Sequence, residues 1–229
     1  HLEKCLEAAA LSKHTTRQIA QRLENDGNIE GALALYIEAQ KKIPAYTNLY
    51  QIALYQGRLN NQTAMVNAYL DAIDMAPKRA NQTKSLMLRA FGDDLELKAV
   101  LKQQLIKRLQ KQSKPLLVLD DLLLWLYLQN GEFEKAYKQE LAIDRKYKAQ
   151  GKRLLKFADI AQKNNKYRLA LLVLDNLMAL GTAHPLHEEA LKTKLIFSFQ
   201  ALPKDSTNHK KASALKTIFD TSFKENQAF

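Results

Sequence analysis

A run of basic side chains beyond the middle of the sequence is the strongest candidate for a binding site among the charged side chains. No acidic residue interrupts it, and its cations are Arg145, Lys146, Lys148, Lys152, Arg153 and Lys156. Such a cluster could bind the phosphates of RNA or DNA. A helix C-terminus also attracts cations, however, and only Tyr147 offers the interleaved aromatic ring that single-strand recognition favours. We therefore keep RNA or DNA as the alternative partner, behind the protein partner predicted below.

Two histidines in the last quarter of the chain raise the question of a metal site. His184 and His187 lie three residues apart, directly before Glu188 and Glu189. No second ligand pair with suitable spacing occurs elsewhere in the sequence. The carboxylates are explained by the positive N-terminal end of a helix. The sequence therefore predicts no metal site.

Paired aspartates are a further candidate for catalysis. Asp93-Asp94 and Asp120-Asp121 both precede or open predicted helices, where aspartate caps the backbone and complements the helix dipole. The sequence has no glycine-rich phosphate loop and no HExxH or GxSxG motif, and its single cysteine, Cys5, cannot form an intrachain disulfide. We therefore predict a protein that is not an enzyme and needs no cofactor.

The composition indicates what kind of scaffold carries these residues. The chain has 229 residues, of which 46% are apolar, with only 7 glycines and 5 prolines. This usage suits long helices and nearly excludes an all-β fold. Lysine and arginine exceed aspartate and glutamate by 35 − 24 = 11, so attraction to polyanions or acidic proteins is physically available.

The most apolar stretch, residues 116–128, is the one candidate for a membrane helix. Eleven of its 13 residues are apolar, but Asp120 and Asp121 interrupt it. A bilayer span needs roughly 18 or more apolar residues. The stretch is therefore predicted to be a buried helix, with no membrane span.

A recurring turn signal divides the sequence. Residues 27–32 (GNIEGA) and 131–136 (GEFEKA) are the same hexad, which recurs at residues 164–170 (NNKYRLA) and more weakly at 60–65 (NNQTAM). A period of about 34 residues is typical of stacked helix pairs. In every copy twelve residues separate a position on the first helix from its counterpart on the second: Ala20 to Ala32, Ala53 to Met65, Leu124 to Ala136, and Ala158 to Ala170.

With these residues the sequence resembles the tetratricopeptide-repeat (TPR) family, over residues 13–77 and 116–178. The first copy has Ile19, Ala20 and Leu23 before Ala32, Tyr36 and Pro44, and the second has Leu49, Ile52 and Ala53 before Met65, Tyr69 and Pro77. The later copies depart from the family pattern: Leu124 replaces the small residue, Glu140 replaces the aromatic residue, and no proline closes the copy. The resemblance implies an all-α fold, a right-handed α-solenoid of stacked antiparallel helix pairs.

We expect a single solenoid domain over residues 1–229. An opening helix over residues 1–12 precedes five helix pairs at 13–45, 46–78, 79–114, 115–149 and 150–182, and C-terminal helices follow over 183–229. The third pair has diverged, with helices expected near 79–91 and 94–112 and with Gly92-Asp93 as turn and cap.

The resemblance also implies that the first helices of the pairs line a concave groove. Tyr50 and Trp125 would be its apolar anchors for a peptide segment, although Trp125 could instead be ordinary core in a helix apolar all round. We therefore predict a non-enzymatic protein–protein interaction scaffold that binds a partner segment or docks as a subunit of a larger assembly. The predicted partner-binding groove comprises Arg17, Gln21, Tyr50, Leu54, Arg58, Asp121, Trp125, Lys152, Asp159 and Lys163.

The start of the sequence bears on location. The resemblance includes bacterial repeat proteins that work in the cytoplasm and others that work, after export, in the cell envelope. The sequence begins at His1 rather than at a methionine. We therefore expect the periplasm or cell envelope, with the cytoplasm as the alternative.

Overall fold

Helices make up all the regular structure that can be described. The computed structural model describes residues 12–111, 116–201 and 209–224, and no strand occurs within these ranges. The all-α fold class is therefore confirmed. The elements are α2 (Lys13–Asn25), α3 (Ile29–Lys42), α4 (Tyr46–Arg58), α5 (Gln62–Met75), the short 3-10 helix η1 (Pro77–Arg79), α6 (Ala80–Phe91), α7 (Leu95–Lys111), α8 (Leu117–Gln129), α9 (Phe133–Tyr147), α10 (Lys152–Lys163), α11 (Tyr167–Met178), α12 (His187–Gln200) and α13 (His209–Lys224).

The chain divides into two compact units, His1–Leu126 and Tyr127–Phe229, with the division inside α8. The expectation of a single solenoid domain stays a prediction. The predicted opening helix falls on residues that lie outside the described ranges, apart from Ser12, which caps α2.

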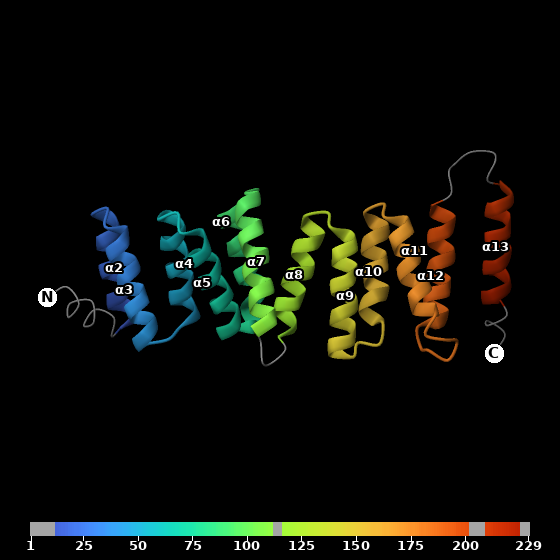
Figure 1. Ribbon diagram of the computed structural model, residues 1–229, viewed down its shortest axis with the longest axis horizontal. Coiled ribbons are helices and arrows are strands. Elements are labelled where there is room, and N and C mark those ends of the chain that lie inside the picture. The colour runs from blue at the N-terminus through green and yellow to red at the C-terminus, as the bar shows by residue number, and fades with distance from the viewer. Residues whose placement is uncertain (1–11, 112–115, 202–208, 225–229) are drawn as a thin grey trace. The chain divides into compact units, whose positions relative to one another are not determined.

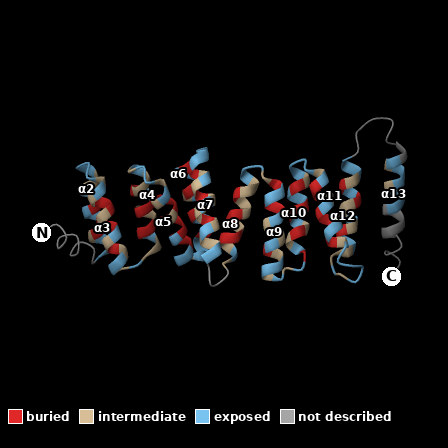
Figure 2. Ribbon diagram, in the orientation of Figure 1, coloured by how far each residue is buried: buried red, intermediate tan, exposed pale blue. Residues whose placement is uncertain are grey.

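Within each unit, most helices that follow one another in the chain pack as neighbours (Figure 1). In the first unit α2 packs on α3, α3 on α4 and α4 on α5, and in the second α9 packs on α10, α10 on α11 and α11 on α12. Small residues lie where paired helices approach each other, and Figure 2 shows the buried face along these helices. At most 1% of the surface is exposed at each of Ala20, Ala32, Ala53, Ala136, Ala158 and Ala170.

The repeated hexad forms the same turn each time. Gly27, Asn60, Gly131 and Asn165 occupy equivalent positions, and all four have φ between 59° and 76°. Glycine adopts this left-handed backbone without strain, and asparagine tolerates it better than other residues do. In every copy the following amide donates to the carbonyl five residues earlier, at 2.8 or 2.9 Å. Asparagine thus keeps the helix end intact in the two copies that lack the glycine.

The third pair is built differently, as its diverged sequence suggested. Helices α6 and α7 coincide closely with the expected ranges, and α5 packs against both of them. Gly92 ends α6 as expected. The cap of α7 is Asp94 rather than Asp93, since Asp94 Oδ1 accepts hydrogen bonds from the amides of Glu96 and Leu97 at 2.8 and 3.1 Å.

Two residues of the repeat motif are less buried than their places in the motif imply. Ile19, a large apolar residue of the motif, is 37% exposed, because Thr16 and Ala20 occupy the buried face of α2. Leu124 is half-buried, whereas the alanines at the equivalent positions are buried. Asp120 lies in the first turn of α8, as predicted, and it is only 5% exposed.

Candidate partner-binding site

The predicted apolar anchors of the groove lie in the first unit. Tyr50 and Leu54 lie one turn apart on α4, and Asp121 and Trp125 lie one turn apart on α8. Tyr50 and Trp125 are half-buried, so neither aromatic ring is simply core. Leu54 is 43% exposed, which is unusual for a leucine on a helix that packs against two neighbours.

Helix α6 contributes two residues that sequence reasoning missed. Lys84 and Leu88 lie 34 residues after Tyr50 and Leu54, respectively, so they are at equivalent places of the next first helix. Leu88 is 39% exposed, close to the value for Leu54. The 34-residue spacing was the signal that could have found them. It went unused because the third pair lacks the repeat motif.

Two side-chain contacts of α6 join these helices. The Tyr50 hydroxyl lies 2.9 Å from Oγ1 of Thr83, and Nζ of Lys84 lies 5.1 Å from the centroid of the Trp125 ring. The second distance is within the range of a cation–π interaction. Because Thr83 and Lys84 are adjacent in sequence, one turn of α6 holds both predicted anchors in place.

A second aromatic ring extends this surface at the start of α4. Tyr46 packs edge-on against Tyr50 with ring centroids 5.6 Å apart, and the Arg79 guanidinium lies 5.1 Å from the Tyr46 centroid. Neither Tyr46 nor Arg79 was among the predicted site residues. The surface therefore combines aromatic rings with cations that lie over their faces.

A pocket of about 220 Å³ opens between the N-terminal parts of α6 and α8. Lys78, Asn81, Lys84 and Asp121 provide its polar lining, and Ile73 contributes to the apolar part. The lining therefore offers hydrogen-bond donors beside apolar surface, which suits a peptide segment with mixed side chains.

Of the predicted groove residues on or near α2, Arg58 is less available to a partner than Arg17 and Gln21 are. Arg17 and Gln21 are exposed on α2. Arg58 forms an ion pair with Glu24, and the Tyr55 hydroxyl donates to the same carboxylate at 3.0 Å. The Arg58 side chain therefore links α4 to α2 within the fold, which leaves it less available to bind a partner.

The titration behaviour of this cluster follows from its contacts. The hydrogen bond from Arg58, followed by that from Tyr55, lowers the pKa of Glu24 below its ordinary value. Burial, together with the hydrogen bond to Glu24, raises the pKa of Tyr55 to about 12. Both shifts favour the ion pair at neutral pH, with Glu24 charged and Tyr55 still a donor.

The remaining predicted groove residues belong to the second unit. Lys152, Asp159 and Lys163 are all exposed on α10. Their place in a groove with the residues of the first unit stays a prediction.

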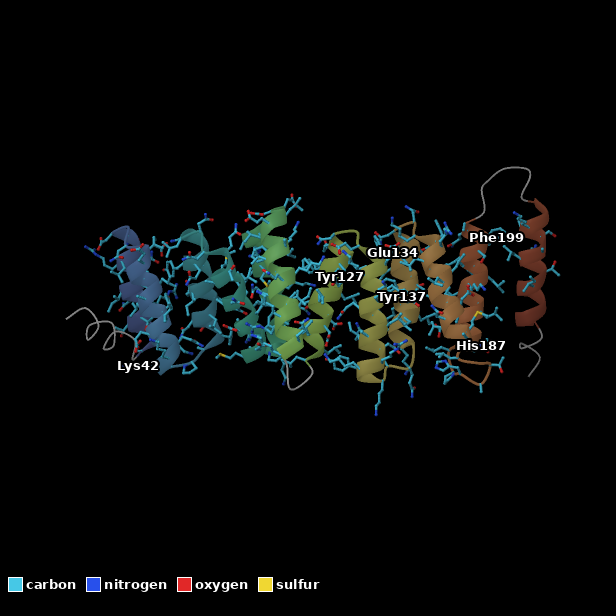
Figure 3. The ribbon with its side chains drawn as sticks, viewed as in Figure 1. Lys42, Tyr127, Glu134, Tyr137, His187 and Phe199 are labelled. Atoms are coloured by element: carbon cyan, nitrogen blue, oxygen red, sulfur yellow. The ribbon has the colours of Figure 1, made fainter. Side chains whose placement is uncertain are left out.

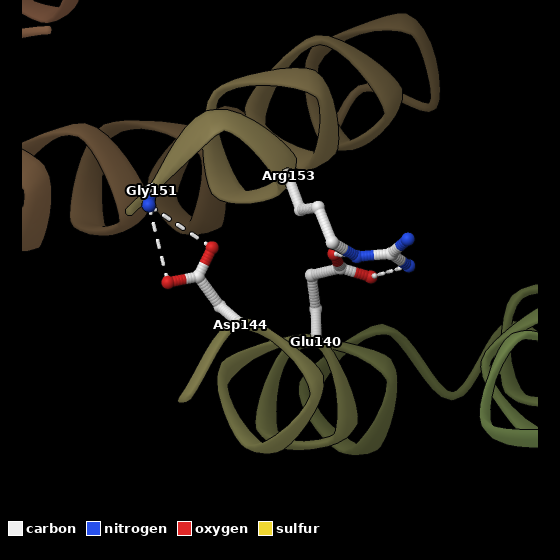
Figure 4. A network of polar contacts seen from close by, with 4 residues as sticks. All are labelled: Glu140, Asp144, Gly151 and Arg153. Atoms are coloured by element: carbon white, nitrogen blue, oxygen red, sulfur yellow. Dashed lines mark hydrogen bonds and ion pairs between the residues drawn. The ribbon is translucent and has the colours of Figure 1, made fainter. Parts of the chain in front are cut away.

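The basic cluster of residues 145–156 is divided by the fold, as Figure 4 shows for one member. Arg153 forms a two-pronged ion pair with Glu140, with Nε to Oε1 at 2.5 Å and Nη2 to Oε2 at 3.1 Å. Nζ of Lys146 lies 5.4 Å from the centroid of the Tyr147 ring. Arg153 is therefore committed to the α9–α10 contact, contrary to the expectation that all six cations form one edge. The other members, Arg145, Lys148, Lys152 and Lys156, are exposed.

The loop between α9 and α10 is shaped by Asp144. Both carboxylate oxygens accept from the amide of Gly151, at 3.0 and 3.1 Å (Figure 4). Lys148 and Gln150 have φ of 52°, and Gly151 has φ of 81°. Three left-handed residues within four positions make this a tight, specific connection.

The histidine pair lies at the start of α12, where Figure 3 labels His187. Nδ1 of His184 accepts from the amide of Leu186 at 3.3 Å. Within residues 12–111, 116–201 and 209–224, no group of three or more His, Cys, Asp or Glu side chains is arranged to hold a metal ion. The helices in these same ranges are too short or too polar to cross a membrane.

No family model and no curated protein matches the chain. A solved structure titled MamA 41-end from Desulfovibrio magneticus RS-1 is similar at 12% sequence identity with a TM-score of 0.31. That similarity covers 96% of this chain and 99% of that one. The all-α fold is shown by the helices themselves, which pack in succession with alanines buried at equivalent positions.

Proposed function

We propose that the protein is a non-enzymatic interaction scaffold that binds a segment of a protein partner on the exposed faces of α4, α6 and α8. The observation that carries this proposal is the row formed by Leu54, Leu88 and Trp125. These residues occupy equivalent places on three successive first helices, and each leaves apolar surface open to solvent. A partner that covers these side chains removes their apolar surface from water, and this burial contributes favourable free energy to binding.

The adjoining polar groups would give such a partner its orientation. Lys84 lies over Trp125 and also lines the neighbouring pocket with Lys78 and Asn81. Apolar side chains of the segment would cover the row, while its polar groups would meet the donors in the pocket. The partner is either a free segment or a neighbouring subunit of a larger assembly that presents one.

The double substitution Leu54→Ser and Leu88→Ser should weaken binding of this partner at least about tenfold, because each leucine contributes part of the roughly 1.5–3 kcal/mol of a buried side chain. The partner is first captured from native extract and identified by mass spectrometry. It is then titrated against the purified protein, with the fluorescence of Trp125, the one tryptophan of the chain, as the signal.

The matched control is Leu172→Ser, since Leu172 is 49% exposed on α11, outside the proposed surface. The control should bind like the unchanged protein. If the double variant also binds normally and the fluorescence of Trp125 does not respond to the partner, the proposed surface is wrong.

A second candidate function is polyanion binding by the remaining cations of the α9–α10 region. It is favoured by the exposure of Arg145, Lys148, Lys152 and Lys156 along a stretch without acidic residues. For a single-stranded oligonucleotide that contacts all of them, log affinity should fall against log salt with a slope of about −3, at about −0.7 per contact.

The variant for this test replaces all four cations with glutamine. Its control makes the same change at the exposed residues Lys13, Arg89, Lys107 and Lys111. Loss of binding in the first variant alone would support the candidate. Absence of binding by the unchanged protein at low salt, or equal binding by both variants, would exclude it.

A further inference from the structure

An apolar groove of about 420 Å³ lies between α12 and α13 in the second unit. Its walls are Leu195, Ile196 and Phe199 of α12 and Leu215 of α13, and Gln200 and Lys216 are the polar residues that line it among the described side chains. The groove is on different helices from the proposed surface of α4, α6 and α8. It therefore needs its own explanation.

The groove exists because α12 is apolar on two sides. Leu195 and Phe197 are 8% and 7% exposed, and α12 packs against α11. Ile196 and Phe199, one turn apart, are 39% and 54% exposed, and Figure 3 labels Phe199 on α12. Helix α13 packs on α12 but does not cover these two side chains.

Helix α13 contributes the second exposed edge. Ile218 follows Leu215 by one turn and is 48% exposed. Each of the two helices thus presents apolar side chains three residues apart, which is the spacing of neighbours on a helix surface. Two such edges form a seat for a third helix that carries an apolar stripe.

The charges around the groove indicate which charge a bound helix should carry. Helices α12 and α13 contain six lysines and three acidic residues, Glu188, Glu189 and Asp220. Lys194 is paired with Asp175, while Lys192, Lys211 and Lys216 are exposed. The rim that a bound helix would meet is therefore basic, and carboxylates on the flanks of that helix would be attracted to it.

We propose that the α12–α13 groove is a docking site for an acidic amphipathic helix of a protein partner. Apolar side chains of that helix cover Ile196, Phe199 and Ile218, and its flanking carboxylates pair with Lys211 and Lys216. This site is separate from the proposed function of the first unit, so either one can fail while the other stands.

The probe is a synthetic peptide of about 18 residues, long enough to form a helix once bound, with leucines on one face, glutamates on both flanks and alanines elsewhere. Two further peptides serve as comparisons: a scrambled sequence of the same composition and a version with lysine in place of glutamate. Binding to the full-length protein is measured by fluorescence anisotropy of a labelled peptide.

The acidic amphipathic peptide should bind the unchanged protein at least tenfold more tightly than either comparison peptide does. The double substitution Ile196→Ser and Phe199→Ser should reduce that affinity at least tenfold. Its control, Leu172→Ser with Leu180→Ser, removes two exposed leucines outside the groove and should leave the affinity unchanged. Circular dichroism checks that every variant keeps its helices.

Charge provides a test that does not depend on the apolar lining. Lys216→Glu should weaken binding of the acidic peptide at least threefold more than Lys163→Glu, a reversal at an exposed lysine of α10. Equal binding of the scrambled peptide, or equal effects of the groove and control variants, would overturn the proposal. So would a homodimer in sedimentation experiments that Ile196→Ser with Phe199→Ser dissociates, because a second copy would then be the occupant.

Discussion

Replacing Arg153 with alanine should destabilise the protein by about 3 kcal/mol, because the change removes a two-pronged ion pair from the buried carboxylate of Glu140. Glu140 is 2% exposed, and it meets Arg153 through two hydrogen-bonded contacts that join α9 to α10. The expected loss is at the low end of the range for buried ion pairs, because the Arg153 side chain is still 26% exposed. Denaturant unfolding of the full chain, followed by circular dichroism, measures the loss.

The repeat pattern supplies the control for this prediction. Glu140 stands where the first two copies have Tyr36 and Tyr69, which are 7% and 5% exposed. The double substitution Glu140→Phe with Arg153→Leu restores an apolar residue and removes both charges, so it should recover most of the lost stability. Lys156→Ala, at an exposed cation of the same helix, should change stability by no more than about 0.5 kcal/mol.

A loss for Arg153→Ala no larger than that for Lys156→Ala would mean that the pair contributes nothing to the α9–α10 contact. In that case Arg153 would return to the set of cations available for a polyanion. The experiment thus also decides how many members the basic cluster of residues 145–156 has.

The repeat spacing predicted the local structure of the chain because the turn chemistry is encoded within a few residues. Gly27 and Asn165 form the same left-handed turn although their residue types differ, and the aligned alanines are buried as the spacing implied. Such features depend on neighbours in sequence, which a single sequence displays directly.

The side-chain partners could not be predicted in the same way, because they depend on which helices meet. Arg58 was assigned to the groove, yet Glu24, 34 residues earlier, takes it as an ion-pair partner. Arg153 was assigned to a basic edge, yet its guanidinium forms an ion pair with the buried carboxylate of Glu140. For Arg153, the signal was an acidic residue, Glu140, at a packing position, which predicts that a nearby cation is used internally. Glu24 offered no such signal, since it is only half-buried on α2.

The exposed row of the first unit shows the opposite situation. Lys84 and Leu88 were missed because the third pair carries no recognisable motif, although they lie one repeat after Tyr50 and Leu54. Here position within the repeat was more informative than motif. Counting the repeat length through a diverged copy would have identified α6 as part of the surface.

Replacing Gly151 with alanine should destabilise the protein by about 2–5 kcal/mol, because two costs add at this position. Gly151 has φ of 81°, where a Cβ costs about 1–2 kcal/mol. That Cβ would also lie 2.4 Å from Cδ2 of Leu177, whose side chain is fully buried and has little room to move. Crowding of this kind in a packed core typically costs about 1–3 kcal/mol.

Gly131→Ala separates the two costs. Gly131 has φ of 69°, and nothing lies within 4 Å of the position a Cβ would take, so only the backbone cost applies. Unfolding free energies should therefore show a loss for Gly151→Ala that exceeds the loss for Gly131→Ala by about 1–3 kcal/mol. Equal losses would mean that Leu177 yields to the added carbon. The α9–α10 loop would then hold its course through the bonds from Gly151 to Asp144 rather than through close packing on α11.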